Sequence, residues 1–203
     1  MALTKTKKRS RTDSMRLLTT VAFLSVVVWS GESAKSRAAE PSAPVAGSKA
    51  ADFMLESMDG VKVRLSDEVA RGPLVLTVLR GWPGYDCPFC TRQFADYLSH
   101  AEAFEQRGAR VLFVYPGPVD KLKEHAAGFI ASRPMPAPFR VLLDPDYTFT
   151  NAYGLRWNAP NETAYPATFV LNERGVVTFA SVSRGHGDRV STEVVLKALA
   201  QNP

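Results

Sequence analysis

The stretch LVLTVLRGWPGYDCPFCTRQF, residues 74–94, joins an apolar run to a pair of closely spaced cysteines. Residues 74–79 are continuously apolar, which is typical of a strand buried on both faces of a sheet. Residues 88–107 place apolar side chains at helical spacing, and Gly108 ends that pattern. Cys87 and Cys90, the two cysteines of the chain, therefore lie where a buried strand is followed by the start of a helix.

Strand and helix patterns alternate along the rest of the chain. Residues 53–55 and 61–65 flank the turn MDG and predict a hairpin. Beyond residue 108 the pattern predicts strands at residues 111–115, 139–143, 167–172 and 176–182, and helices at residues 119–132, 147–153 and 190–200. The last two strands are joined by the short turn ERG, so they must be antiparallel.

This order of elements predicts an α/β domain with a central mixed sheet, helices on both faces and an N-terminal hairpin. It is the order expected of a thioredoxin-like fold with extra N-terminal and central elements. The pattern alone also allows a flavodoxin-like fold, but the position of the cysteines favours the thioredoxin-like fold. We expect this domain to cover residues 52–203.

The N-terminal segment indicates export. Residues 1–38 carry eight Lys and Arg against two acidic residues, which gives this segment a net charge of +6. Since the whole chain has a net charge of +5, the remaining residues have a net charge of −1. The basic pI therefore belongs to the leader, and nothing indicates a nucleic-acid partner. An apolar run of about 20 Å at residues 17–29 is too short to cross a ~30 Å hydrocarbon core. We expect a secretory signal peptide at residues 1–38, cleaved after Ala38 or Ala39, and no stable membrane span.

Two other interpretations of the N-terminal segment remain open. Met15 begins a more compact signal peptide and is a second candidate initiator. An uncleaved N-terminus that tethers the protein to a membrane is the other alternative. Residues 39–51, AEPSAPVAGSKAA, are small and aperiodic, so they predict a linker between the leader and the domain.

The Cys-x-x-Cys spacing allows four interpretations. A zinc site needs four ligands, but the chain has no second cysteine pair and its three histidines lack ligand spacing. A structural disulfide across so short a loop would remove little unfolded-state entropy. Two packed, inert thiols are the third possibility. A redox pair is favoured because a thiolate at a helix start is stabilised by unpaired N–H groups and the helix dipole.

The loop PGYDCPFCTRQ, residues 83–93, resembles the active-site loop of peroxiredoxins, in the alkyl hydroperoxide reductase/thiol-specific antioxidant family of the thioredoxin-like superfamily. That loop reads Pro-x-x-x-Thr-x-x-Cys, followed by Thr or Ser and by Glu or Gln. Pro83 matches the proline, Cys90 the peroxide-attacking cysteine, and Thr91 and Gln93 the downstream positions. Cys87 stands where the family has Thr or Ser, which also makes the loop a thioredoxin-type Cys-x-x-Cys.

A second position departs from the family pattern. The resemblance implies an arginine just before the late strand, where it would hold the thiolate and polarise peroxide, but Pro166 stands there. Thioredoxins have a cis-proline at this site, packed against their cysteines, and an ordinary trans proline at a strand start is the alternative. Arg80 could supply the missing charge, or it could simply be a solvated side chain at a strand end.

The resulting hypothesis is an exported thiol-dependent peroxidase that reduces hydroperoxides, with a redox disulfide between Cys87 and Cys90. An external dithiol, such as a thioredoxin-like protein, would reduce that disulfide, and no metal or organic cofactor is needed. The first alternative is a thiol–disulfide oxidoreductase acting on protein disulfides, with Cys87 as nucleophile. The second is a non-catalytic redox sensor on the same scaffold.

Overall fold

The computed structural model describes residues 41–131 and 133–201. The expected leader, residues 1–38, lies outside the described residues. Within them, no helix has the length and apolar character that crossing a bilayer requires.

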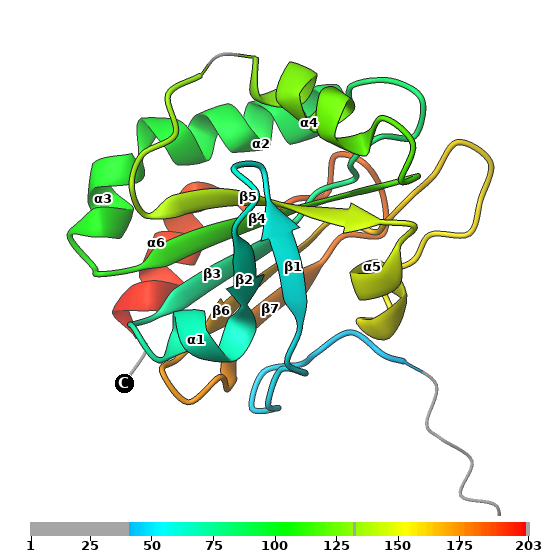
Figure 1. Ribbon diagram of the computed structural model, residues 1–203. Coiled ribbons are helices and arrows are strands. Elements are labelled where there is room, and N and C mark those ends of the chain that lie inside the picture. Colours follow the sequence, from blue (N-terminus) through cyan, green and yellow to red (C-terminus); the bar gives the residue numbers. More distant parts are fainter. Residues whose placement is uncertain (1–40, 132, 202–203) are drawn as a thin grey trace, which may run out of the picture. The chain divides into compact units, whose positions relative to one another are not determined.

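A seven-stranded mixed sheet forms the centre of the domain, with the strand order β2-β1-β5-β4-β3-β6-β7 (Figure 1). Its strands are β1 (Met54–Ser57), β2 (Lys62–Arg64), β3 (Leu74–Val78), β4 (Arg110–Gly117), β5 (Phe139–Pro145), β6 (Ala167–Leu171) and β7 (Val177–Val182). Strands β3, β4 and β5 are parallel, while β6 runs antiparallel to β3 and β1 antiparallel to β5. The α/β class, the mixed sheet and the N-terminal hairpin are confirmed.

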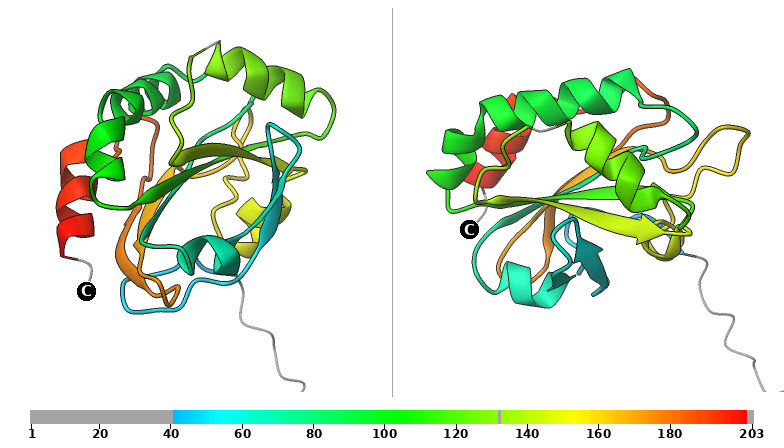
Figure 2. Two further views of the ribbon diagram at one scale, coloured as in Figure 1. Left: turned by 60° about the vertical axis from the view of Figure 1, so that its left-hand side comes forward. Right: turned by 45° about the horizontal axis from the view of Figure 1, so that its top comes forward.

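Helices cover both faces of the sheet (Figures 1 and 2). They are α1 (Leu65–Val69), α2 (Pro88–Ser99), α3 (Ala101–Glu105), α4 (Leu122–Ile130), α5 (Thr148–Ala152) and α6 (Thr192–Ala200). Side chains from α2, α4 and α6 share one apolar core with one face of the central strands, and this core includes both cysteines. Side chains from α1 and α5 pack in a second core on the other face.

Two local features differ from the expected elements. The single helix expected at residues 88–107 is two helices, because the chain leaves helical geometry at His100. The Ser99 hydroxyl and the His100 ring both bond to the carbonyl of Asp96, a local competition with the helical bonding pattern. The short helix α1 was not expected, since five residues are too few to show a helical period.

Part of the expected linker is attached to the sheet. The N–H of Gly47 donates to the carbonyl of Val177 at 2.8 Å, and the N–H of Ala50 donates to Gly175 at 3.0 Å. Lys49 forms an isolated bridge with Val176, and the Ala50 side chain is buried in the second core. Residues 47–50 therefore extend the domain along the edge of β7. The division of the chain at residue 38 stays a prediction.

Candidate active site

The loop after β3 reaches the site through a close approach of two backbones. Gly81 has a φ of +65°, and a Cβ at this position would overlap the carbonyl group of Pro116 at the end of β4. The next residue, Trp82, donates its N–H to that same carbonyl at 3.0 Å. A glycine is required here both by the positive φ and by the space. The loop is thereby held against the end of β4 just before the cysteines.

The two cysteines occupy the start of α2. Cys87 is the N-cap residue, Pro88 is the first helical residue and Cys90 lies in the first turn. Proline suits this position because it has no N–H to lose and its φ is already helical. Both thiols are free and almost completely buried, with exposed fractions of 2% for Cys87 and 1% for Cys90. Access to either sulfur is therefore controlled by the side chains around them.

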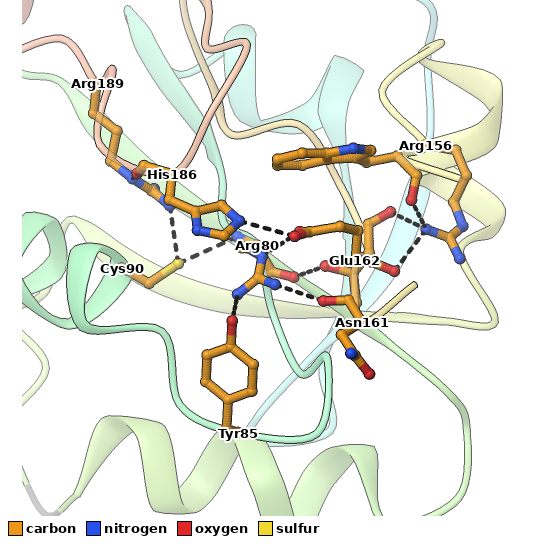
Figure 3. A network of polar contacts seen from close by, with 10 residues as sticks. Arg80, Tyr85, Cys90, Arg156, Asn161, Glu162, His186 and Arg189 are labelled. Atoms are coloured by element: carbon orange, nitrogen blue, oxygen red, sulfur yellow. Dashed lines mark hydrogen bonds and ion pairs between the residues drawn. The ribbon is translucent and has the colours of Figure 1, made fainter. Parts of the chain in front are cut away.

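Two nitrogen donors contact the sulfur of Cys90 from opposite parts of the chain (Figure 3). The backbone N–H of Arg80 lies 3.3 Å from Sγ, and Nη2 of Arg189 lies 3.2 Å from it. The Arg189 guanidinium is oriented by Nη1, which donates to Oε1 of Gln93 at 2.7 Å, and by Nε, which donates to the carbonyl of His186 at 2.9 Å. Cys90 therefore has a positive charge and a backbone dipole directed at its sulfur.

The two thiols differ in acidity because they share one proton. The pKa of Cys87 is lowered to about 5, chiefly by a hydrogen bond from the Cys90 thiol, with further help from the N–H groups of Cys90 and Phe89 and from the charge of Arg189. Burial raises the pKa of Cys90 well above its ordinary value, and so does its bond to Cys87. At neutral pH the pair carries one negative charge, which rests on Cys87 while Cys90 keeps its proton.

Three of the residues named from sequence support this arrangement in different ways. Gln93 is buried and holds Arg189. Thr91 donates through its hydroxyl and its N–H to the carbonyl of Cys87, so it stabilises the first helical turn rather than a sulfur. Pro166 is buried just before β6, where its carbonyl accepts the N–H of Ser183, and it lines one small crevice together with Gln93 and Arg189. Pro83 is half-buried in the loop before Cys87.

The Arg80 side chain fits neither of the two interpretations given above, because it is buried rather than solvated and its guanidinium bonds to groups other than the sulfur. Its guanidinium is 1% exposed and bonds to Glu162 at 2.5 Å, to the hydroxyl of Tyr85 at 2.7 Å and to the carbonyl of Asn161 at 2.5 Å (Figure 3). A buried guanidinium needs a carboxylate partner, and Glu162 is nearer than the sulfur in this packing. Arg80 serves Cys90 through its backbone N–H instead.

Arg189 is the functional side chain that the sequence did not reveal. It ends the Gly-rich stretch RGHGDR, residues 184–189, which connects β7 to α6 and has no periodic pattern. The resemblance directed attention to an arginine before the late strand, but here the positive charge comes from the loop after that hairpin. A search for any arginine near the ends of the last strand would have included it.

Comparisons with known proteins define the class to which this fold and site belong. The family model described as "AhpC/TSA family" matches residues 46–180. A putative peroxiredoxin bcp of Helicobacter pylori (strain J99) is 30% identical over 152 residues, covering 71% of this chain and 93% of the relative. The thiol-disulfide oxidoreductase ResA of Bacillus subtilis is 29% identical over 131 residues, covering 64% of each chain.

A solved structure gives the same fold. Peroxidoxin BcpB from Mycobacterium tuberculosis superposes with a TM-score of 0.62 at 22% identity, over 78% of this chain and 97% of that one. The chain is a thioredoxin-like oxidoreductase. It belongs to the AhpC/TSA family, the family of the peroxiredoxins.

Proposed function

We propose that this protein is an exported thiol-dependent peroxidase that reduces hydroperoxides at Cys90. The observation that carries the proposal is the guanidinium of Arg189, 3.2 Å from the Cys90 sulfur and oriented by Gln93. A fixed positive charge at that point stabilises a thiolate and can also polarise the O–O bond of a bound peroxide. The similarity to the peroxiredoxin bcp of Helicobacter pylori supports the same chemistry.

The proposed cycle begins with a proton shift between the two sulfurs. At rest Cys87 is the thiolate and Cys90 donates a hydrogen bond to it, so moving that proton to Cys87 places the charge on Cys90. The Cys90 thiolate attacks one oxygen of ROOH, the O–O bond breaks, and RO⁻ leaves to take a proton and become ROH. Cys90 becomes a sulfenic acid, and the Cys87 thiol then condenses with it to give a disulfide and water.

An external dithiol would complete the turnover. Its two thiols reduce the Cys87–Cys90 disulfide and become a disulfide themselves, so two electrons pass from the dithiol to the peroxide. A thioredoxin-like protein is a partner of this chemical class. Tyr85 and Phe89 are exposed on either side of Cys87 and offer an apolar surface on which such a partner could dock. Export to an oxidising compartment would make a dedicated electron donor necessary.

The ionisation of Cys87 favours a second candidate, a thiol–disulfide oxidoreductase. A thiolate with a pKa of about 5 at the N-cap of a helix is the usual nucleophile for attack on a protein disulfide. Pro166 beside the site and the similarity to the ResA of Bacillus subtilis agree with this alternative. In this case Cys87 attacks and Cys90 resolves the mixed disulfide.

Trapping of sulfenic acid in the two single-cysteine variants separates these functions. In Cys87→Ser the peroxidase hypothesis predicts that hydrogen peroxide produces a dimedone-reactive sulfenic acid on Cys90, because no resolving thiol remains. In Cys90→Ser the same treatment should give little label. Label confined to Cys87, together with mixed disulfides trapped on Cys87 and faster reduction of insulin than of peroxide, would select the disulfide oxidoreductase instead.

A further inference from the structure

One carboxylate lies at the centre of the polar network beside the site. Glu162, in the segment between α5 and β6, places Oε2 at 2.5 Å from Nε of Arg80 and Oε1 at 2.9 Å from Nε2 of His186 (Figure 3). Its side chain is only 11% exposed. Hydrogen bonds from Arg80 and His186 outweigh the effect of burial and lower its pKa, so Glu162 is ionised at neutral pH. Glu162 makes no contact with either sulfur that would give it a direct catalytic task.

The first arm of this network leads to Cys90 through Arg80. The guanidinium of Arg80 is held by Glu162, by Tyr85 and by the carbonyl of Asn161, and the hydroxyl of Thr163 donates to the carbonyl of Arg80. Because the side chain and the carbonyl are both fixed, the backbone of Arg80 has little freedom to move. Its N–H, which points at the sulfur of Cys90, is fixed with it.

The second arm leads to the same sulfur through His186 and Arg189. The ring of His186 bonds to Glu162, and the backbone carbonyl of His186 accepts Nε of Arg189. Nη2 of Arg189 then reaches Cys90. The loop between β7 and α6 contains two glycines, Gly185 and Gly187, and no proline, so a side-chain anchor is needed to hold Arg189 in one place.

We propose that Glu162 is a positioning residue that sets the ionisation of Cys90 by fixing both of the donors to its sulfur. The proposal deepens the proposed function, on which it rests for the role of Cys90 as the attacking thiol. The two donors, the N–H of Arg80 and the guanidinium of Arg189, come from other segments than Glu162, so in a positioning role the carboxylate acts on the sulfur only through them. Without the carboxylate, the buried guanidinium of Arg80 would lose its ionic partner and the loop that carries Arg189 would lose its anchor.

A positioning role and a direct electrostatic role of Glu162 predict opposite changes in the pKa of Cys90 when the carboxylate is removed. The negative charge of Glu162 by itself disfavours a second negative charge on Cys90, so its neutralisation alone would lower the pKa of Cys90. Loss of the anchor instead lets Arg189 and the N–H of Arg80 drift from the sulfur, which raises that pKa. A well-placed opposite charge lowers a pKa by about 1–3 units, so the loss of placement should outweigh the weaker, more distant repulsion.

The test uses the full chain with Cys87→Ser, so that Cys90 is the single thiol, and measures its pKa from the ultraviolet absorbance of the thiolate. Adding Glu162→Gln should raise the pKa of Cys90 by about one unit and slow its reaction with hydrogen peroxide about tenfold at fixed pH. His186→Ala removes only the second arm, and should raise the same pKa by a smaller amount. Because its side chain is 35% exposed, this variant should fold even if Glu162→Gln does not.

A second buried carboxylate provides a matched control. Glu68 on α1 is 7% exposed and bonds to Arg110 at 2.7 Å and to Arg71 at 3.3 Å, at the end of β4 away from the cysteine loop. Glu68→Gln should lower the free energy of unfolding by an amount comparable to Glu162→Gln and leave the pKa of Cys90 unchanged. A pKa that falls or stays constant in Glu162→Gln, or that rises equally in Glu68→Gln, would overturn the proposal. The titration reads ionisation alone, so it decides this even if Cys90 does not react with peroxide.

Discussion

Arg189 donates from Nη2 to the sulfur of Cys90 at 3.2 Å across a separation of 99 residues. The contact brings the loop before α6 onto the first turn of α2, and Gln93 on the same helix orients the guanidinium. Charge at this sulfur is therefore controlled by a residue from another part of the chain. The charge of Arg189 also acts to lower the pKa of both thiols, beside the larger effects of burial and of the bond between them.

Removing this charge should impair peroxide reduction. Arg189→Met keeps much of the side-chain volume, and we expect it to lower the rate of sulfenic acid formation on Cys90 about 100-fold, the usual effect of losing one donor to a developing charge. Arg189→Lys should recover only part of the rate, since an ammonium cannot bond to Gln93 and the sulfur with the same fork geometry. Stopped-flow kinetics with hydrogen peroxide measures both. Arg107→Met, an exposed residue after α3, should retain the full rate.

The reduced protein should titrate one thiolate at low pH. We expect a step in thiolate absorbance with a midpoint near pH 5 from Cys87, and no second step until far above the ordinary thiol range, because burial and the shared proton hold the pKa of Cys90 high. Cys90→Ala should move the Cys87 step upward, since the hydrogen bond from Cys90 is the largest cause of its low pKa. A step near pH 5 that survives in Cys87→Ser would contradict the assignment.

The same ionisation predicts how redox state changes stability. A thiol whose pKa is lowered by folding adds to the free energy of unfolding as pH rises from its folded pKa, about 5, toward its unfolded value of 9.0. This contribution is lost as pH falls through 5, and the disulfide form lacks it at any pH. The reduced protein should therefore be the more stable form at pH 7, with the difference shrinking toward pH 5. Urea unfolding with and without dithiothreitol at the two pH values measures it.

Gly81 and Gly84 allow steric overlap to be separated from backbone conformation. Both have positive φ, +65° and +110°, but a Cβ on Gly81 would overlap Pro116 whereas a Cβ on Gly84 would meet nothing within 4 Å. Gly84→Ala should cost about 1–2 kcal/mol of stability from the positive φ alone. Gly81→Ala should cost distinctly more and should also slow the reaction with peroxide, because it displaces Arg80. Equal losses of stability in the two variants would show that the contact with Pro116 is unimportant.

Export predicts a shortened N-terminus. Protein recovered from the periplasm or the medium should begin at Ala39 or Glu40, where N-terminal sequencing would place the cut. Replacing part of the apolar run at residues 17–29 with charged residues should leave the uncleaved protein inside the cell. An intact Met1 or Met15 on exported protein would argue for a tethered N-terminus instead.

Local patterns in the sequence were enough to predict the order of elements and the place of the cysteines. These follow from local rules, since the apolar run of β3, the helical spacing after Pro88 and the turn between β6 and β7 each span only a few residues. The break of the helix at His100 escaped this reasoning because it accompanies side-chain bonds, from the Ser99 hydroxyl and the His100 ring to the carbonyl of Asp96, that the spacing of apolar residues does not reveal.

Which charges reach the sulfur depends on how distant segments pack together, and local patterns could not predict it. Arg80 lies ten residues from Cys90 and yet its guanidinium bonds to Glu162, whereas Arg189, 99 residues away, contacts the sulfur itself. The reason is physical: a buried charge is placed by whichever partners the packed elements bring within a few ångströms, and that depends on sheet order and loop path, not on distance along the chain. The cysteines could be found from their spacing, but their different acidities arise from contacts that exist only in the folded protein.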